Sequence, residues 1–166
     1  MRLRRILLAT LAVALLAGGG AAGLHASRKP AAPAYRLSAM KAMLFYEHSA
    51  TFSGDLLSQR GLSLWNTIVG EGDAKEPAHA VLVTVRVTGE AGSFEPARRV
   101  ELTARTENRV ILRQAQDIGV LNAEGRTHVG FWLYGVGCSK VRLRARLVGQ
   151  ATESPRTGEI PFECGE

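Results

Sequence analysis

Residues 140–148 alternate between apolar and basic side chains more regularly than any other stretch of the chain. Valine, leucine and alanine occupy the odd positions from 141 to 147, and Arg142, Arg144 and Arg146 occupy the even ones. Successive side chains of a β-strand point to opposite faces of the sheet, so this pattern is typical of a strand buried on one face only. The stretch predicts an antiparallel sheet with one solvated face.

The same reasoning extends over the rest of the chain. Residues 80–88 and 99–105 also alternate, and weaker strand candidates lie at 43–48, 52–57, 62–68, 109–114, 128–134 and 159–164. Turn-forming residues separate them, above all at 70–73, 89–92 and 122–125. No long segment has an apolar stripe of helical period. The pattern predicts an all-β fold, an immunoglobulin-like two-sheet antiparallel β-sandwich, with a barrel as the alternative.

The N-terminus has the composition of an export signal. Arg2, Arg4 and Arg5 precede an apolar stretch, and small residues follow through Ala22, where a signal peptidase would cleave. The alternative is an uncleaved helix, because residues 6–26 carry no charge and are long enough to anchor the chain in a membrane. Either alternative predicts an exported protein, periplasmic or secreted, or held at the membrane by residues 6–26.

These features divide the chain into three parts. Residues 1–26 are predicted to be the signal peptide or signal anchor. Residues 27–41, which include Pro30 and Pro33, are predicted to be a flexible tether, and residues 42–166 a single β-sandwich domain.

The net charge does not indicate a nucleic-acid partner. The chain has 21 basic and 15 acidic residues, but three of the arginines belong to the predicted signal. The remaining 18 basic and 15 acidic residues leave a charge of only +3, so no nucleic-acid binding is predicted.

Cys138 and Cys164 are the only cysteines, and both follow the predicted signal. An even number of cysteines in an oxidising compartment favours a disulfide. A redox or metal-thiolate site is disfavoured because the pair lacks Cys-x-x-Cys spacing. We therefore predict a structural bridge that holds the C-terminal strand in place.

The segment 70–79 is a weak candidate for a metal site. It contains Glu71, Asp73, Glu76 and His79, and hard cations such as Ca²⁺ require several oxygen ligands at one point. The spacing does not match an EF-hand, and Lys75 brings a competing positive charge. A solvated loop is favoured, and neither a metal nor another cofactor is predicted.

Catalysis is disfavoured as well. The chain has no Gly-x-Ser-x-Gly elbow and no His-Glu-x-x-His motif. A triad assembled from distant positions, as in a small hydrolase, is the alternative. The run of residues 64–72 resembles a motif, but no function follows from it.

Two surfaces are candidates for contact with a partner. Arg142, Arg144 and Arg146 stand in one row about 6.8 Å apart, and their repulsion must be offset by acids on neighbouring strands, such as Glu101, or by an anionic partner. A solvated face is the favoured interpretation of this row.

The second candidate surface comes from the aromatic run 131–134. Phe131 and Leu133 are expected to face the core, while Trp132 and Tyr134 lie under a loop or form an exposed patch. The covered arrangement is favoured, and Trp65 is expected in the core. The sequence thus predicts a non-enzymatic interaction or envelope-structural module with a protein or anionic envelope component as partner. The alternative is a periplasmic ligand- or metal-binding protein that uses residues 70–79.

Overall fold

Eleven β-strands and no helix form the secondary structure of the described residues. The computed structural model describes residues 34–107, 109–136, 138–150 and 153–165. All of them belong to one compact unit, residues 31–166. The predicted signal or anchor segment, including the helix expected there, and most of the predicted tether lie outside the described residues. The described part of the chain contains no helix, and therefore no helix that could cross a membrane.

Seven of the strands have five or more residues, and four have only two. The strands are β1 (Arg36–Tyr46), β2 (Thr51–Phe52), β3 (Leu64–Trp65), β4 (Glu71–Gly72), β5 (Ala80–Thr88), β6 (Arg99–Arg105), β7 (Val110–Asp117), β8 (Arg126–Tyr134), β9 (Val141–Val148), β10 (Arg156–Ile160) and β11 (Phe162–Glu163).

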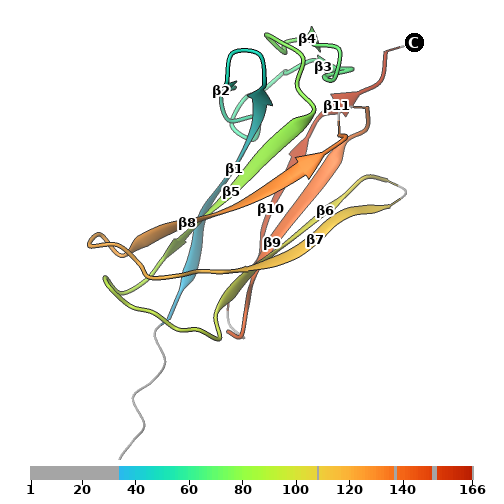
Figure 1. Ribbon diagram of the computed structural model, residues 1–166. Helices are drawn as coiled ribbons and strands as arrows, with labels where there is room; N and C mark the ends of the chain where they lie inside the picture. Colours follow the sequence, from blue (N-terminus) through green and yellow to red (C-terminus); the bar gives the residue numbers. More distant parts are fainter. Residues whose placement is uncertain (1–33, 108, 137, 151–152, 166) are drawn as a thin grey trace, which may run out of the picture. The chain divides into compact units, whose positions relative to one another are not determined.

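The strands form two four-stranded antiparallel sheets and one small sheet. The first sheet has the order β2-β1-β5-β8, and the second has the order β10-β9-β6-β7. The small sheet, β11-β3-β4, lies with β2 at one end of the sandwich (Figure 1). Its β11–β3 pair is parallel and ties the C-terminal strand to residues 64–65.

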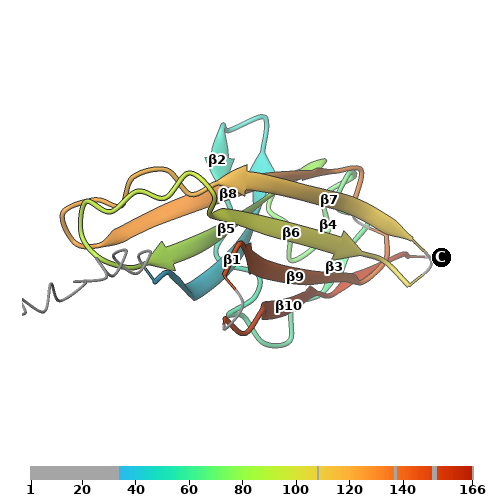
Figure 2. The same cartoon turned by 90° about the horizontal axis from the view of Figure 1, so that it is seen from below.

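The two large sheets enclose a common core, and Figure 2 shows them from below the view of Figure 1. Every second residue of β5 is fully buried, from Val81 to Val87, and Phe131 of β8 lies beside them. Leu102 and Leu143 cover them from the second sheet. The inward faces therefore share one core, and the outer faces of the two sheets point away from each other. The predicted all-β, sandwich-like architecture is confirmed.

Side chains join the two sheets along their edges. On one side, Nε2 of Gln116 in β7 donates to the carbonyl oxygen of Gly130 in β8 at 2.7 Å. On the other, Nε of Arg156 in β10 donates to the carbonyl oxygen of Leu37 in β1 at 2.8 Å. These bonds satisfy backbone groups that face no neighbouring strand.

The strands predicted from strict alternation are confirmed, with β5 and β6 matching to the residue and β9 to within one. The tether prediction is wrong at its C-terminal end, because β1 begins at Arg36 and buries Leu37. A register shift between Leu37 and Ala39 interrupts the alternation there and hides the strand in the sequence.

The strand predicted over residues 52–57 is largely wrong, because only Thr51–Phe52 is extended. The backbone turns at Asp55, whose carbonyl oxygen accepts a bond from the N–H of Ser58 at 3.2 Å. The carboxylate of Asp55 instead accepts a bond from the N–H of Ala42 at 3.1 Å. This segment therefore bonds to the edge of β1 through side chains and through single backbone N–H groups, those of Ser53 and Leu56, rather than as a continuous strand.

Candidate functional site

Four aromatic side chains gather on the outer face of the first sheet. We call Phe45, Phe52, Trp132 and Tyr134 the aromatic patch. The ring centroid of Phe45 lies 5.2 Å from the ring centroid of Phe52 and 5.8 Å from that of Trp132. The ring centroids of Trp132 and Tyr134 are 6.3 Å apart. These spacings are typical of interacting aromatic pairs. The exposed fractions are 44% for Phe52, 38% for Trp132 and 70% for Tyr134.

The covered arrangement predicted for Trp132 and Tyr134 is therefore wrong. Phe131 and Leu133 face the core as expected, but no loop of the described residues shields the opposite face. Trp65 is also 44% exposed, contrary to its predicted place in the core. Sequence reasoning missed Phe45 and Phe52, which pair across β1 and β2 only because the chain turns back between them.

The same outer face carries a group of basic side chains beyond the patch. We call Lys41, Arg86, Arg126 and His128 the cationic cluster. Arg86 pairs across strands with His128, and Nε of Arg86 donates to Nε2 of His128 at 3.4 Å. Burial lowers the pKa of His128, and the charges of Arg86, Lys41 and Arg126 lower it further. Burial and the surrounding cations thus disfavour the protonated form of this imidazole.

No carboxylate balances these charges from within the sheet. None of the four strands of the first sheet contains an Asp or a Glu. A groove of about 470 Å³ adjoins the cluster and is lined in part by Arg86, Arg126 and His128. The lack of acids in these strands is visible in the sequence, and it could have identified the surface.

The arginine row of β9 is in a different electrostatic environment. Nε of Arg146 lies 2.7 Å from Oε1 of Glu101, and Nε of Arg142 lies 3.3 Å from Oε2 of Glu159. Glu101 also contacts Arg113 at 3.5 Å. The predicted role of Glu101 in offsetting the row is confirmed, and two of the three arginines are paired.

Arg144 lies between two threonines, Thr103 of β6 and Thr157 of β10. Arg105 stands directly opposite Arg142 across the strands, and a shallow groove of about 600 Å³ runs over these residues. Neither Arg105 nor Arg144 forms an ion pair within the described part of the chain. The groove therefore contains two guanidinium groups that form no ion pair among the described residues.

The acidic segment 70–79 does not converge on a single point. The carboxylate of Glu71 accepts a bond from the side chain of Asn66, and that of Asp73 from the backbone of Ser63. Glu76 accepts a bond from the N–H of Ser49. Each carboxylate thus fastens a different part of the loops. Within the described ranges, no three His, Cys, Asp or Glu side chains are grouped to hold a metal.

His79 pairs with an acid outside its own segment. Its Nδ1 lies 2.7 Å from Oε1 of Glu47, and both side chains are about half exposed. Such a pair orients an imidazole, as the acid does in a catalytic triad. Among the described residues, however, no hydroxyl or thiol group hydrogen-bonds to His79. The pair therefore connects the turn after β1 to the segment before β5.

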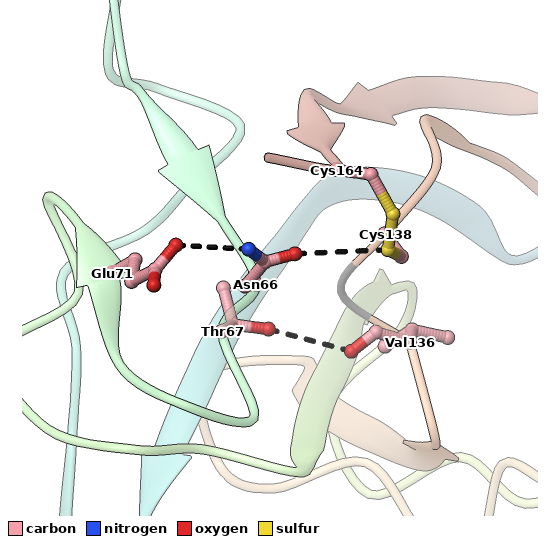
Figure 3. The surroundings of a disulfide bond; sticks show 6 residues. All are labelled: Asn66, Thr67, Glu71, Val136, Cys138 and Cys164. Carbon is pink, nitrogen blue, oxygen red and sulfur yellow. Dashed lines mark hydrogen bonds between the residues drawn. A yellow bond between two sulfur atoms is a disulfide. The ribbon is translucent and has the colours of Figure 1, made fainter. Parts of the chain in front are cut away.

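Cys138 and Cys164 form the predicted disulfide, with Cα atoms 4.4 Å apart (Figure 3). Asn66 lies beside it with a positive φ of 43°. Its Nδ2 donates to Glu71 at 2.8 Å, and its Oδ1 lies 3.8 Å from the sulfur of Cys138. The sulfur of a disulfide carries no proton, so the second contact is not a hydrogen bond. The motif-like run 64–72 thus has a structural role, because it forms a loop that is held in place around Asn66.

Thr67 holds the same loop in place from the next position. It is fully buried, and its hydroxyl donates to the carbonyl oxygen of Val136 at 3.4 Å (Figure 3). The turn that follows leaves Ile68 and Val69 exposed, at 51% and 67%. The same end of the sandwich therefore presents further apolar side chains.

Comparison with known proteins adds no assignment. No protein-family model matches the chain, and no curated protein is significantly similar to it.

Proposed function

We propose that this chain is an exported, non-enzymatic interaction module whose contact surface is the outer face of the first sheet. The observation that carries the proposal is the aromatic patch. Four neighbouring aromatic side chains on a rigid sheet are costly to leave in water, because apolar surface is stabilised when a partner removes it from solvent. Aromatic residues of this kind are enriched at protein interfaces.

The arginine row is the weaker candidate for this contact. Glu101 and Glu159 already engage Arg146 and Arg142, so only part of the positive charge of the row is available to a partner. Among the described residues, the aromatic patch has no comparable internal partner beyond its own ring contacts.

Export is part of the proposal. A disulfide between Cys138 and Cys164 is compatible with an oxidising compartment outside the cytoplasm. The basic and apolar residues at 1–26 supply the signal, either cleaved or retained as an anchor helix. The protein then works in the periplasm or beyond it, at the surface of an envelope component.

We further propose an immunoglobulin-like topology. If the seven longer strands are numbered in chain order, the sheets contain strands 1-2-5 and 7-6-3-4. Immunoglobulin constant domains have the orders 1-2-5-4 and 7-6-3. The difference is the fourth strand, β7, which here pairs with β6 and leaves β8 at the edge of the first sheet. Gln116 bonds this edge at Gly130, but no strand of the described residues pairs with it, and the end of β8 beside the patch is therefore accessible to a partner.

Site-specific photo-crosslinking in cells tests the proposed surface. A benzophenone amino acid in place of Tyr134 in the full chain should give adducts after irradiation of the intact envelope. The matched control carries the same group in place of Phe94, an aromatic residue in the loop between β5 and β6 that is 54% exposed. The result that contradicts the proposal is an absence of adducts from position 134, or equal adducts from both positions.

A further inference from the structure

We propose that the outer face of the first sheet docks on an anionic lipid surface, with the aromatic patch in the headgroup layer and the cationic cluster on the lipid phosphates. This inference rests on the proposed function, since it names the partner of the same face.

The first argument is the position of the two groups on one face of the sheet. Trp132 and His128 lie four residues apart on β8, so both side chains project from the outer face, about 13 Å from each other. Lys41 stands between these levels, in the row that pairs it with Thr84. A planar partner can therefore touch the aromatic and the cationic groups at once.

The second argument is charge complementarity. Four basic residues, Arg36, Lys41, Arg86 and Arg126, lie in the strands of this sheet, and no acidic residue accompanies them. Basic side chains near an anionic leaflet gain about 1 kcal/mol each. The rings of Trp and Tyr suit the boundary between lipid chains and water, because they combine an apolar body with a polar atom. The lack of carboxylates on these strands also favours binding, because the lipid phosphates would repel a carboxylate.

The third argument comes from chain length. Because β1 begins at Arg36, only residues 27–35 separate it from the predicted apolar segment. Nine extended residues span about 30 Å. If residues 6–26 stay in the membrane, the domain cannot move far from the lipid surface, and Arg36 belongs to the cationic end of the face. The tether would then supply a high effective concentration for a weak contact.

A second copy of the chain fits this face less well. Two such faces would bring eight basic residues together without an acid among their strands. An acidic, apolar protein remains the competing partner, and the experiment below separates it from lipid.

Vesicle binding tests the proposal with residues 31–166, which form a compact unit with its own core and disulfide. The probes are neutral phosphatidylcholine vesicles and vesicles with about one third phosphatidylglycerol. We expect binding to the anionic vesicles only. Arg86→Gln with Arg126→Gln should weaken it roughly thirtyfold, on the scale of two surface charges. The matched control is Arg105→Gln with Arg144→Gln, the same change of charge on the opposite face, which should bind like the wild type.

Tryptophan fluorescence locates the contact. The chain has two tryptophans, so Trp65→Phe leaves Trp132 as the only reporter. Its emission should shift to shorter wavelength with anionic vesicles and be quenched by brominated lipids. Trp132→Ser with Tyr134→Ser should weaken binding, and Phe94→Ser should not. Circular dichroism of every variant confirms that it has folded.

Several results would overturn the lipid proposal. They are no binding to anionic vesicles, an equal loss of vesicle affinity in both double arginine variants, or binding without a change in the fluorescence emission of Trp132. Protein adducts alone from position 134 in the crosslinking experiment would overturn it too, yet leave the proposed interaction surface intact. If crosslinking at 134 also fails, the proposed function falls with it.

Discussion

The side-chain amide of Gln150 pairs with both backbone groups of Tyr35. Oε1 of Gln150 accepts the N–H of Tyr35 at 2.9 Å, and Nε2 donates to its carbonyl oxygen at 2.6 Å. Tyr35 immediately precedes β1, whose N-terminal half has no strand on one side because β2 pairs only with residues 45 and 46. Glu153 bonds the N–H of Leu37 in the same way. Side chains thus take the place of a neighbouring strand and block the edge against other chains.

The first prediction follows from this pair. Gln150→Ala removes two hydrogen bonds to a partly buried backbone, which should cost about 1–3 kcal/mol of unfolding free energy. Amide hydrogen exchange at Tyr35 and Leu37 should accelerate, while exchange in β5 should change only with global stability. Gln114→Ala, at an exposed position of β7, is the control. Unchanged exchange at Tyr35 would show that Gln150 does not hold the edge.

The second prediction concerns the disulfide. Cys138→Ser with Cys164→Ser releases a loop with a sequence separation of 26 residues, and the chain-entropy relation gives a loss of about 3.5 kcal/mol. The loss should be seen in urea denaturation, and a reducing agent should destabilise the wild type but not the double variant. Hydrogen exchange should rise first in β11 and β3, because the bridge holds the C-terminus beside Asn66. Equal stability of the two proteins would contradict this role.

The third prediction concerns Glu101, whose side chain is only 15% exposed. The hydrogen bond from Arg146 lowers its pKa from the ordinary value of 4.5, burial opposes this, and the charges of Arg146 and Arg113 reinforce it. The folded state therefore favours the carboxylate. Its contribution to stability is complete above the unfolded pKa and is lost as the pH falls through the folded pKa.

Glu101→Gln should accordingly cost about 1–2 kcal/mol near neutral pH. The difference from the wild type should start to shrink as the pH falls below about 4.5, the ordinary value that applies to the unfolded chain, and disappear below the lowered pKa of the folded carboxyl. Chemical denaturation across this range measures it. Asp117→Asn is the comparison, because its pair with Arg99 is exposed on both sides and should contribute less. A pH-independent difference at Glu101 would rule out the charge as its cause.

Strict alternation allowed the long strands to be predicted because it reports burial on one face directly. Residues 80–88 and 99–105 were located to the residue for this reason. The N-terminal half of β1 was not, since the register shift after Leu37 breaks the alternation. Residues 53–57 look like a strand by composition, but Asp55 directs the chain into a turn whose side chains bond β1. Two-residue strands such as β3 and β4 carry too little pattern to be recognised.

The candidate surface was only half predictable. Trp132 and Tyr134 alternate with core residues, which places them on an outer face, but whether a loop covers that face depends on contacts distant in sequence. Phe45 and Phe52 join them through the hairpin between β1 and β2. The carboxylates of residues 70–79 are a candidate cluster by sequence because they lie close together along the chain. In space each is directed to a separate loop partner, and neither composition nor spacing contains that information.

The last prediction concerns His128. Burial and the nearby cations Arg86, Lys41 and Arg126 lower its pKa below the ordinary value of 6.5. The unfolded chain therefore binds a proton more readily than the folded protein, and stability falls as the pH drops below the unfolded pKa. Glutamine does not titrate, so His128→Gln should match the wild type near pH 7.5 and melt at a higher temperature near pH 5. His48→Gln, in an exposed turn, controls for the loss of one histidine elsewhere. If the two melting curves of His128→Gln and wild type keep the same separation at both pH values, the cations do not act on His128 as the geometry requires.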